Sequence, residues 1–122
     1  MFLIDSSGWI EFFTSGARAA GYEKYIKNLT RIVTPTIVLY EVYKKIKREN
    51  TEENALQAVS LINKTSVIQL SESLALLAAD LSLKYSLPMA DAVVYATALE
   101  ENCKVVTSDT HFKSLEKVIF IS

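Results

Sequence analysis

Aspartate is scarce in this chain, and one aspartate stands where a charge is unexpected. The sequence has ten glutamates but only four aspartates. Asp91 lies in the stretch LPMADAVVYATAL (87–99), whose alanines and valines predict a helix that is apolar on nearly every side. A first-turn aspartate gains only about 0.3–1 kcal/mol from the helix dipole. The position of Asp91 therefore favours a chemical function.

Three further acids lie shortly after apolar runs that predict strands. Asp5 follows FLI, Asp109 follows KVVTS, and Glu41 lies about a turn and a half into the helix after RIVTP. In open α/β sheets, ligands bind beyond the carboxyl ends of the strands, so these acids and Asp91 can meet at one edge. Each also has a simpler explanation. Asp5 and Asp109 can cap helices, and Glu41 can pair with Lys45 one turn later.

A cluster of these carboxylates requires a positive partner. Two carboxylates 4 Å apart repel by about 4 kcal/mol at an effective dielectric constant of 20. An acidic site of oxygen ligands suits Mg²⁺ or Mn²⁺, which proteins hold with a few carboxylates, waters and substrate phosphates. Such ions serve hydrolysis at phosphorus by lowering the pKa of water and neutralising charge on the reacting oxygens. The sequence predicts a metal site formed by Asp5, Glu41, Asp91 and Asp109.

Hydroxyl side chains stand beside two of these acids. Ser6 and Ser7 follow Asp5, and Thr107 and Ser108 precede Asp109. We interpret Ser6 and Thr107 as candidate contacts to substrate, with ordinary capping of helix starts as the alternative. His111, the only histidine, can act as a general base or phosphate ligand, but a structural role is the favoured interpretation.

Cations share a predicted helix with Glu41. Lys44, Lys45 and Arg48 follow it at spacings of three, four and seven residues, so they lie on the same face. They can bind substrate phosphates, or form an ordinary solvated face. Tyr40 and Tyr43 can stack on unpaired bases, although core or partner contacts are commoner at this spacing.

The elements that position these residues alternate between strand and helix patterns. Strands are expected at 2–4, 31–34, 66–70, 104–108 and 118–122, and helices at 6–13, 36–49, 51–64, 71–85 and from Pro88 onward. Thr36 is the expected N-cap of the second helix, and Pro88 the first residue of the last. This alternation predicts an α/β fold whose mostly parallel sheet is covered on both faces. Residues 1–122 are expected to form one domain.

Composition limits the class of protein. Half of the residues are hydrophobic, 22% are charged and the net charge is −1, so any nucleic-acid binding must use a local patch. The single Cys103 excludes an intrachain disulfide and fits a reducing compartment. Neither a signal-peptide core nor a membrane span is visible in the sequence. We expect a cytoplasmic protein that does not associate with membranes.

Taken together, these motifs resemble a known family. FLIDSSGWIEFF, TPTIVLYEV, LPMADAVVYATAL and VVTSDTHF, in this order and spacing, resemble the PIN-domain ribonucleases of the VapC toxin type. The resemblance covers the whole chain, and places the acidic site of the family on Asp5, Glu41, Asp91 and Asp109. Ser108 is a departure, because many relatives carry a basic residue there.

The resemblance implies several further properties. It implies a three-layer α/β/α sandwich with a central sheet of four to five strands, Mg²⁺- or Mn²⁺-dependent endoribonuclease activity, and a homodimer. It also implies a toxin that a cognate antitoxin neutralises by covering the active-site groove. Our hypothesis is cleavage of single-stranded or loop RNA, with Asp5 and Asp91 as principal metal ligands, Asp109 completing the site, and Glu41 acting on the attacking water.

Two alternatives stay open at this point. One is a catalytically silent RNA- or protein-binding module that uses the face from Lys44 to Arg48. The other is a phosphoacceptor domain of receiver type, which also groups acids at strand ends. It requires an acceptor aspartate in the middle strand, where this chain has SVIQLSES, and an acidic pair where it has Asp5 and Ser6.

Overall fold

A five-stranded parallel sheet forms the centre of the protein. The computed structural model describes residues 1–122 and has the strand order β3-β2-β1-β4-β5, with every neighbouring pair parallel. The strands are β1 (Phe2–Ile4), β2 (Ile32–Pro35), β3 (Ser66–Ile68), β4 (Lys104–Thr107) and β5 (Val118–Phe120). The predicted α/β class is confirmed.

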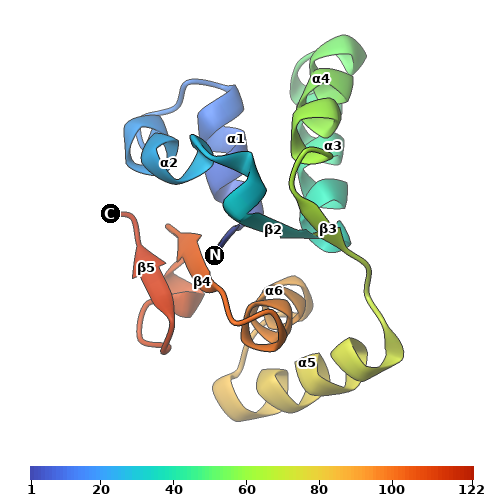
Figure 1. The fold of residues 1–122 in the computed structure, drawn as a ribbon, viewed down its shortest axis with the longest axis vertical. Helices are drawn as coiled ribbons and strands as arrows, with labels where there is room; N and C mark the ends of the chain where they lie inside the picture. The colour runs from blue at the N-terminus through green and yellow to red at the C-terminus, as the bar shows by residue number, and fades with distance from the viewer.

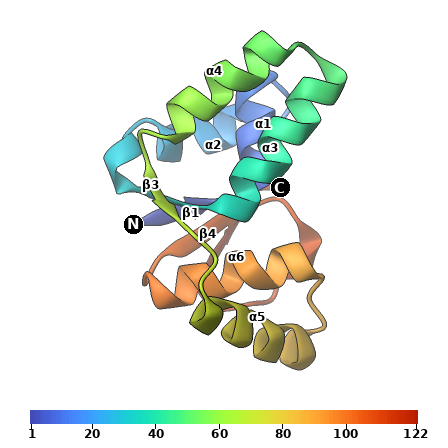
Figure 2. The same cartoon turned by 90° about the vertical axis from the view of Figure 1, so that its right-hand side faces the viewer.

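Helices cover both faces of this sheet. On one face lie α1 (Ser6–Phe13), α2 (Ala19–Ile26), α3 (Thr36–Glu49) and α4 (Glu52–Ile62), and on the other lie α5 (Glu72–Tyr85) and α6 (Met89–Glu100) (Figure 2). Two 3₁₀ turns, η1 (Leu29–Arg31) and η2 (Thr110–Phe112), complete the elements. The expected three-layer α/β/α arrangement is confirmed. None of the helices combines the length and the apolar character that a membrane span needs.

The core explains why the Asp91 segment is so apolar. The strands place Leu3, Ile4 and Val105 in the interior with no exposed surface, and α6 packs between the sheet and α5. Residues 92–98 of α6 are all buried, so alanines and valines are needed on every side of this helix. Asp91 comes immediately before this buried run, in the first turn of the helix.

The strand order reverses beside β1. The chain passes from β1 to β2 and β3 on one side, then crosses to β4 and β5 on the other (Figure 1). In doubly wound sheets, such a reversal leaves a crevice at the carboxyl ends of the two central strands. Asp5 follows β1 and Asp109 lies two residues after β4, so both stand at this crevice. The order also differs from the 2-1-3-4-5 order of receiver domains, which removes support for that alternative.

Two local expectations were wrong, and one helix was not expected. Pro35, not Thr36, caps α3, because its backbone is still extended while Thr36 is already helical. Pro88 likewise caps α6, which begins at Met89. No local pattern predicts an element at residues 14–30, where α2 forms. This short helix has no side-chain cap, and its buried Tyr22 and Ile26 hold it against the rest of the protein.

Candidate active site

Asp5 lies almost completely buried at the end of β1. Only 5% of the residue is exposed, and its carboxylate accepts hydrogen bonds from the Gly8 N–H at 3.2 Å, the Ser7 hydroxyl at 2.8 Å and the Thr107 hydroxyl. Burial nevertheless raises the pKa of Asp5, and the negative charge of Asp109 adds to this effect. Asp5 is therefore both the predicted N-cap of α1 and part of an acidic cluster.

Thr107 links Asp5 to Asp109. Its hydroxyl donates to Asp5 and accepts a hydrogen bond from the Asp109 N–H at 2.9 Å. Because Thr107 has no exposed surface, it cannot touch a substrate in this arrangement, and its placement does not favour the expected substrate contact. Its position suits the orientation of the two aspartates instead.

Asp91 and Asp109 lie in direct contact. Burial raises the pKa of Asp91 to about 7, and its hydrogen bond with Asp109 and the negative charge of that residue contribute to the shift. Two carboxyl groups can share a hydrogen bond only if one of them holds a proton. Asp91 from α6 and Asp109 from the loop after β4 thus form a pair of carboxyl groups in which Asp91 keeps its proton to a higher pH than an ordinary aspartate.

His111, for which a structural role was the favoured interpretation, contacts both members of this pair. Its Nδ1 atom lies 3.0 Å from Asp91 Oδ2 and 2.9 Å from Asp109 Oδ1. The ligand atoms of the three residues lie within 4.8 Å of one another. The sequence signal for this contact is the short spacing between Asp109 and His111. Asp109 caps η2 and its side chain accepts a hydrogen bond from the His111 N–H, so the two side chains are held close together.

Glu41 lines an adjoining groove between α1 and α3. The groove has a volume of about 240 Å³ and is lined by Ser6, Ile10, Tyr40, Glu41, Lys44, Lys45 and Arg48. Ser6 is the residue after Asp5, so the groove begins beside the acidic cluster. The structure thus brings Asp5, Asp91 and Asp109 together and places Glu41 among the predicted cations.

The cations of the groove form ion pairs and hydrogen bonds with residues other than Glu41. Lys45 contacts Glu49 at 3.6 Å rather than Glu41, and Arg48 contacts the same Glu49 at 2.8 Å. Lys44 forms no ion pair, and its ammonium donates to the Tyr40 hydroxyl at 3.2 Å. The pairing of Glu41 with Lys45, proposed as the simpler explanation of Glu41, does not form.

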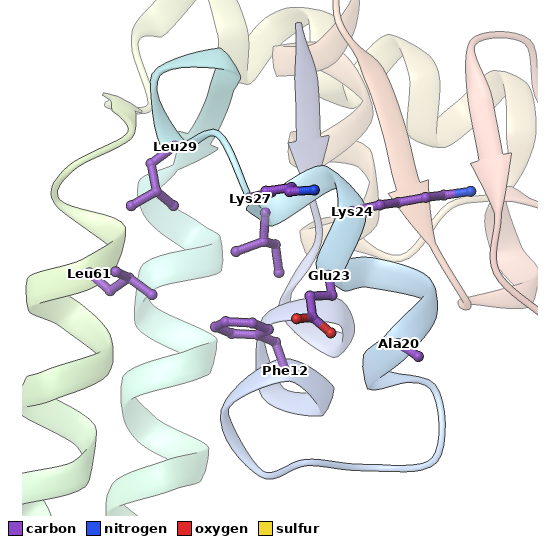
Figure 3. Close-up of a pocket in the computed structure, with 8 residues that line it drawn as sticks. Phe12, Ala20, Glu23, Lys24, Lys27, Leu29 and Leu61 are labelled. Atoms are coloured by element: carbon purple, nitrogen blue, oxygen red, sulfur yellow. The ribbon is translucent and has the colours of Figure 1, made fainter.

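The protein has a larger pocket away from these residues. It has a volume of about 450 Å³ and lies between α2, the end of α1 and the end of α4 (Figure 3). Its lining combines apolar side chains such as Phe12, Leu29 and Leu61 with Glu23, Lys24 and Lys27. Because it has a single carboxylate and none of the clustered aspartates, it does not compete with the cluster as a site of chemistry.

Comparison with known proteins assigns the family. The family model described as the PIN domain matches residues 2–118 of the chain. The chain belongs to the PIN domain family. The comparison with curated protein sequences finds no significant match.

Solved structures share the fold of this PIN domain. A toxin-antitoxin complex from Klebsiella pneumoniae matches with a TM-score of 0.84 and 21% identity, over 100% of this chain and 98% of that one. VapC20 from Mycobacterium tuberculosis, a sarcin-ricin loop cleaving toxin, has a TM-score of 0.80, 16% identity and 95% coverage of both chains. DNA-bound VapBC from Salmonella typhimurium has a TM-score of 0.77 and 16% identity, over 98% and 95% of the two chains.

The acidic cluster of this PIN domain has the chemistry of a divalent-cation site. Its donors are carboxylate oxygens and one imidazole nitrogen, and Mg²⁺ and Mn²⁺ favour oxygen ligands. The negative charge of Asp109 helps to raise the pKa of Asp91, so a cation between the two carboxyl groups would relieve their repulsion. The residues present therefore fit a divalent cation.

Proposed function

We propose that this PIN domain is a metal-dependent endoribonuclease and the toxin of a toxin-antitoxin pair of VapC type. The observation that carries the proposal is the meeting of Asp5, Asp91 and Asp109 at the crevice between β1 and β4. Three carboxylates repel one another in one place, and the charges of Asp109 and Asp5 contribute to the raised pKa of Asp91. Membership of the PIN domain family supports assigning this cluster to nuclease chemistry.

Each acid has a proposed task. Asp5 and Asp91 would be the principal metal ligands, with Asp109 completing the site directly or through water. Bound Mg²⁺ or Mn²⁺ supplies positive charge that lowers the pKa of water and neutralises the reacting phosphate. Glu41 would orient the attacking water or take its proton. His111, between Asp91 and Asp109, can give up its contacts with them when a cation enters.

The groove next to the cluster is the proposed path of the RNA. Lys44, Lys45 and Arg48 would bind backbone phosphates, and Ser6 can donate a hydrogen bond at the end nearest Asp5. Lys45 and Arg48 would exchange their exposed contacts with Glu49 for phosphate. Such exposed ion pairs are worth about 0–1 kcal/mol, so the exchange costs little.

The proposed partners follow from the structural neighbours. One neighbour is described as a toxin-antitoxin complex, and two others as VapBC assemblies bound to DNA. We propose that a cognate antitoxin covers the active-site groove of this chain as well, and that the chain forms a homodimer. Co-expression with the protein encoded by the neighbouring reading frame, followed by light scattering of the purified complex, tests both.

Cleavage of a structured RNA mixture tests the activity. We expect cleavage with Mg²⁺ or Mn²⁺ and none with EDTA. Asp5→Ala and Asp91→Ala should each lower the rate by about 100-fold or more, since a lost ligand costs more than a lost supporting contact. Asp80→Ala is the matched control, because this exposed aspartate of α5 lies outside the site. Full activity of Asp5→Ala or Asp91→Ala would refute the assignment, and RNA binding without cleavage under any condition would favour the silent binding module.

A further inference from the structure

Tyr40 presents an aromatic ring to the groove beside Glu41. The residue is 56% exposed, and it lines the same groove as Glu41, the acid proposed to act on water. A single exposed aromatic residue is common on protein surfaces and means little alone. The Tyr40 ring becomes informative because of the cation beside it.

Lys44 accompanies this ring as a cation without an acidic partner. Its ammonium lies 5.4 Å from the centre of the Tyr40 ring and donates to the Tyr40 hydroxyl. The other groove cations, Lys45 and Arg48, both contact Glu49. Lys44 thus presents an unneutralised positive charge beside an exposed aromatic face. A base stacked on a ring with its phosphate at a cation is a common mode of binding for single-stranded nucleic acids.

The helix geometry arranges these side chains in two rows. Tyr40 and Lys44 are one turn apart and form one row. Glu41, Lys45 and Arg48 form the other row, one residue further round the helix. The groove therefore has an aromatic row beside a row that holds the proposed water-activating acid and the phosphate-binding cations.

We propose that Tyr40 and Lys44 form a nucleotide-binding subsite that takes one unpaired RNA base on the ring and the adjacent phosphate at the ammonium. The inference rests on the proposed function, because it assigns the substrate class of the same groove. A base inside a duplex has no free face, and only an unpaired base can stack on a side chain. The subsite therefore selects single strands and loops over duplex RNA.

Binding measured by fluorescence anisotropy in EDTA separates this subsite from catalysis. The probes are a labelled single-stranded RNA, the same strand with abasic riboses, and the same strand annealed to its complement. Tyr40→Ala should bind the single strand about 5- to 150-fold more weakly, the loss expected when a stacked base loses its aromatic partner. Tyr40→Phe keeps the ring and should bind within about two-fold of the original protein.

The abasic strand isolates the stacking contribution. It keeps the phosphates but offers no base, so Tyr40→Ala and the original protein should bind it within about two-fold of each other. Lys44→Ala should reduce the slope of log K against log salt by about 0.7, the value for one phosphate contact on a single strand.

Lys47 supplies a matched control on the same helix. It pairs with Tyr43 in the way that Lys44 pairs with Tyr40, at 5.3 Å from the ring centre and 3.2 Å from the hydroxyl. However, Lys47 also contacts Glu52 at 3.2 Å and lies outside the groove. Lys47→Ala should therefore leave both the affinity and the salt slope unchanged.

The outcomes separate the two proposals. The subsite is refuted if Tyr40→Ala binds the single strand as the original protein does, if the duplex binds as tightly as the single strand, or if the original protein binds no RNA. Failure of the proposed nuclease function would appear differently, as base-dependent binding by Tyr40 together with an absence of cleavage when Mg²⁺ or Mn²⁺ is supplied.

Discussion

At the residue scale, the negative charge of Asp91 lowers the stability of the folded protein. Its carboxyl group has a pKa of about 7 in the folded protein, against an ordinary value near 3.9 in an unfolded chain. The folded state therefore holds a proton that the unfolded state has released between these pH values. In metal-free protein, Asp91 is without cost below about pH 4, destabilises the fold progressively as the pH rises from there to about 7, and has a constant cost at higher pH. The raised pKa of Asp5 acts in the same direction.

The first prediction concerns Asp91→Asn in the presence of EDTA. An amide is neutral at every pH and can still donate a hydrogen bond to Asp109, so it imitates the protonated acid. At pH 8 the variant should melt about 3–10 °C higher than the original protein, and this difference should vanish near pH 4. Circular dichroism melting across this pH range measures both curves.

A variant at Asp80 controls for a general effect of removing negative charge. Asp80→Asn changes an exposed aspartate of α5 and should shift the melting temperature little at any pH. A lower melting temperature for Asp91→Asn at pH 8 would show that Asp91 stabilises the fold as an anion, contrary to the interpretation of a strained metal ligand.

At the element scale, the close approach of α1 and α2 supports the loop that carries Asp109. The Tyr22 hydroxyl of α2 and the Ser108 hydroxyl lie 2.8 Å apart and share a hydrogen bond, and the Tyr22 ring lies against Gly8 of α1. A Cβ atom at Gly8 would stand 2.4 Å from Tyr22 Cε1 and 2.7 Å from Ile4 Cγ2. Since Tyr22 and Ile4 have no exposed surface, neither side chain has room to move away.

Gly8→Ala should therefore destabilise the protein, although alanine favours helices. Overpacking of a closed core costs about 1–3 kcal/mol, which exceeds the gain of about 1 kcal/mol in helix propensity. Urea unfolding with an unchanged m-value measures the loss. Gly21→Ala in α2 is the matched control. Its Cβ would approach only Ile121, a partly exposed residue beyond β5 that can shift, so stability should not fall. Equal stability of Gly8→Ala and the original protein would contradict the close packing.

The elements differ in how far the sequence determines them. Apolar periodicity predicts the strands and five of the helices, and the side chains of Thr51 and Ser71 cap the starts of α4 and α5. The sequence of α2, AAGYEKYI, has a central glycine and no cap. Its stability comes from burying Tyr22 and Ile26 against other elements, so no local pattern could reveal it.

At the scale of the whole molecule, parallel strands made the site predictable in outline. Every strand ends at the same edge of a parallel sheet, so aspartates within two residues of the ends of β1 and β4 are expected to face one crevice. Two features of the site depend on packing instead. The packing of α3 places Glu41 among cations. The packing of β4 and the loop after it places Thr107 in full burial between two aspartates. These contacts join residues such as Asp5 and Thr107 that are far apart in the chain. The hydrophobic periodicity of a segment describes only its local structure and does not predict such contacts.

The last prediction joins the site to the stability of the whole fold. A cation that binds only the folded protein raises stability by RT ln(1 + [L]/Kd), about 2.7 kcal/mol at a hundred times Kd. Because the cation competes with the proton on Asp91, whose pKa is about 7, Mn²⁺ should raise the melting temperature more at pH 8 than at pH 6. Mg²⁺ should act in the same direction. Asp91→Asn, which removes a proposed ligand, should lose most of the increase, whereas Asp80→Asn should keep it. An equal increase in Asp91→Asn and the original protein would place the bound ion elsewhere on the molecule.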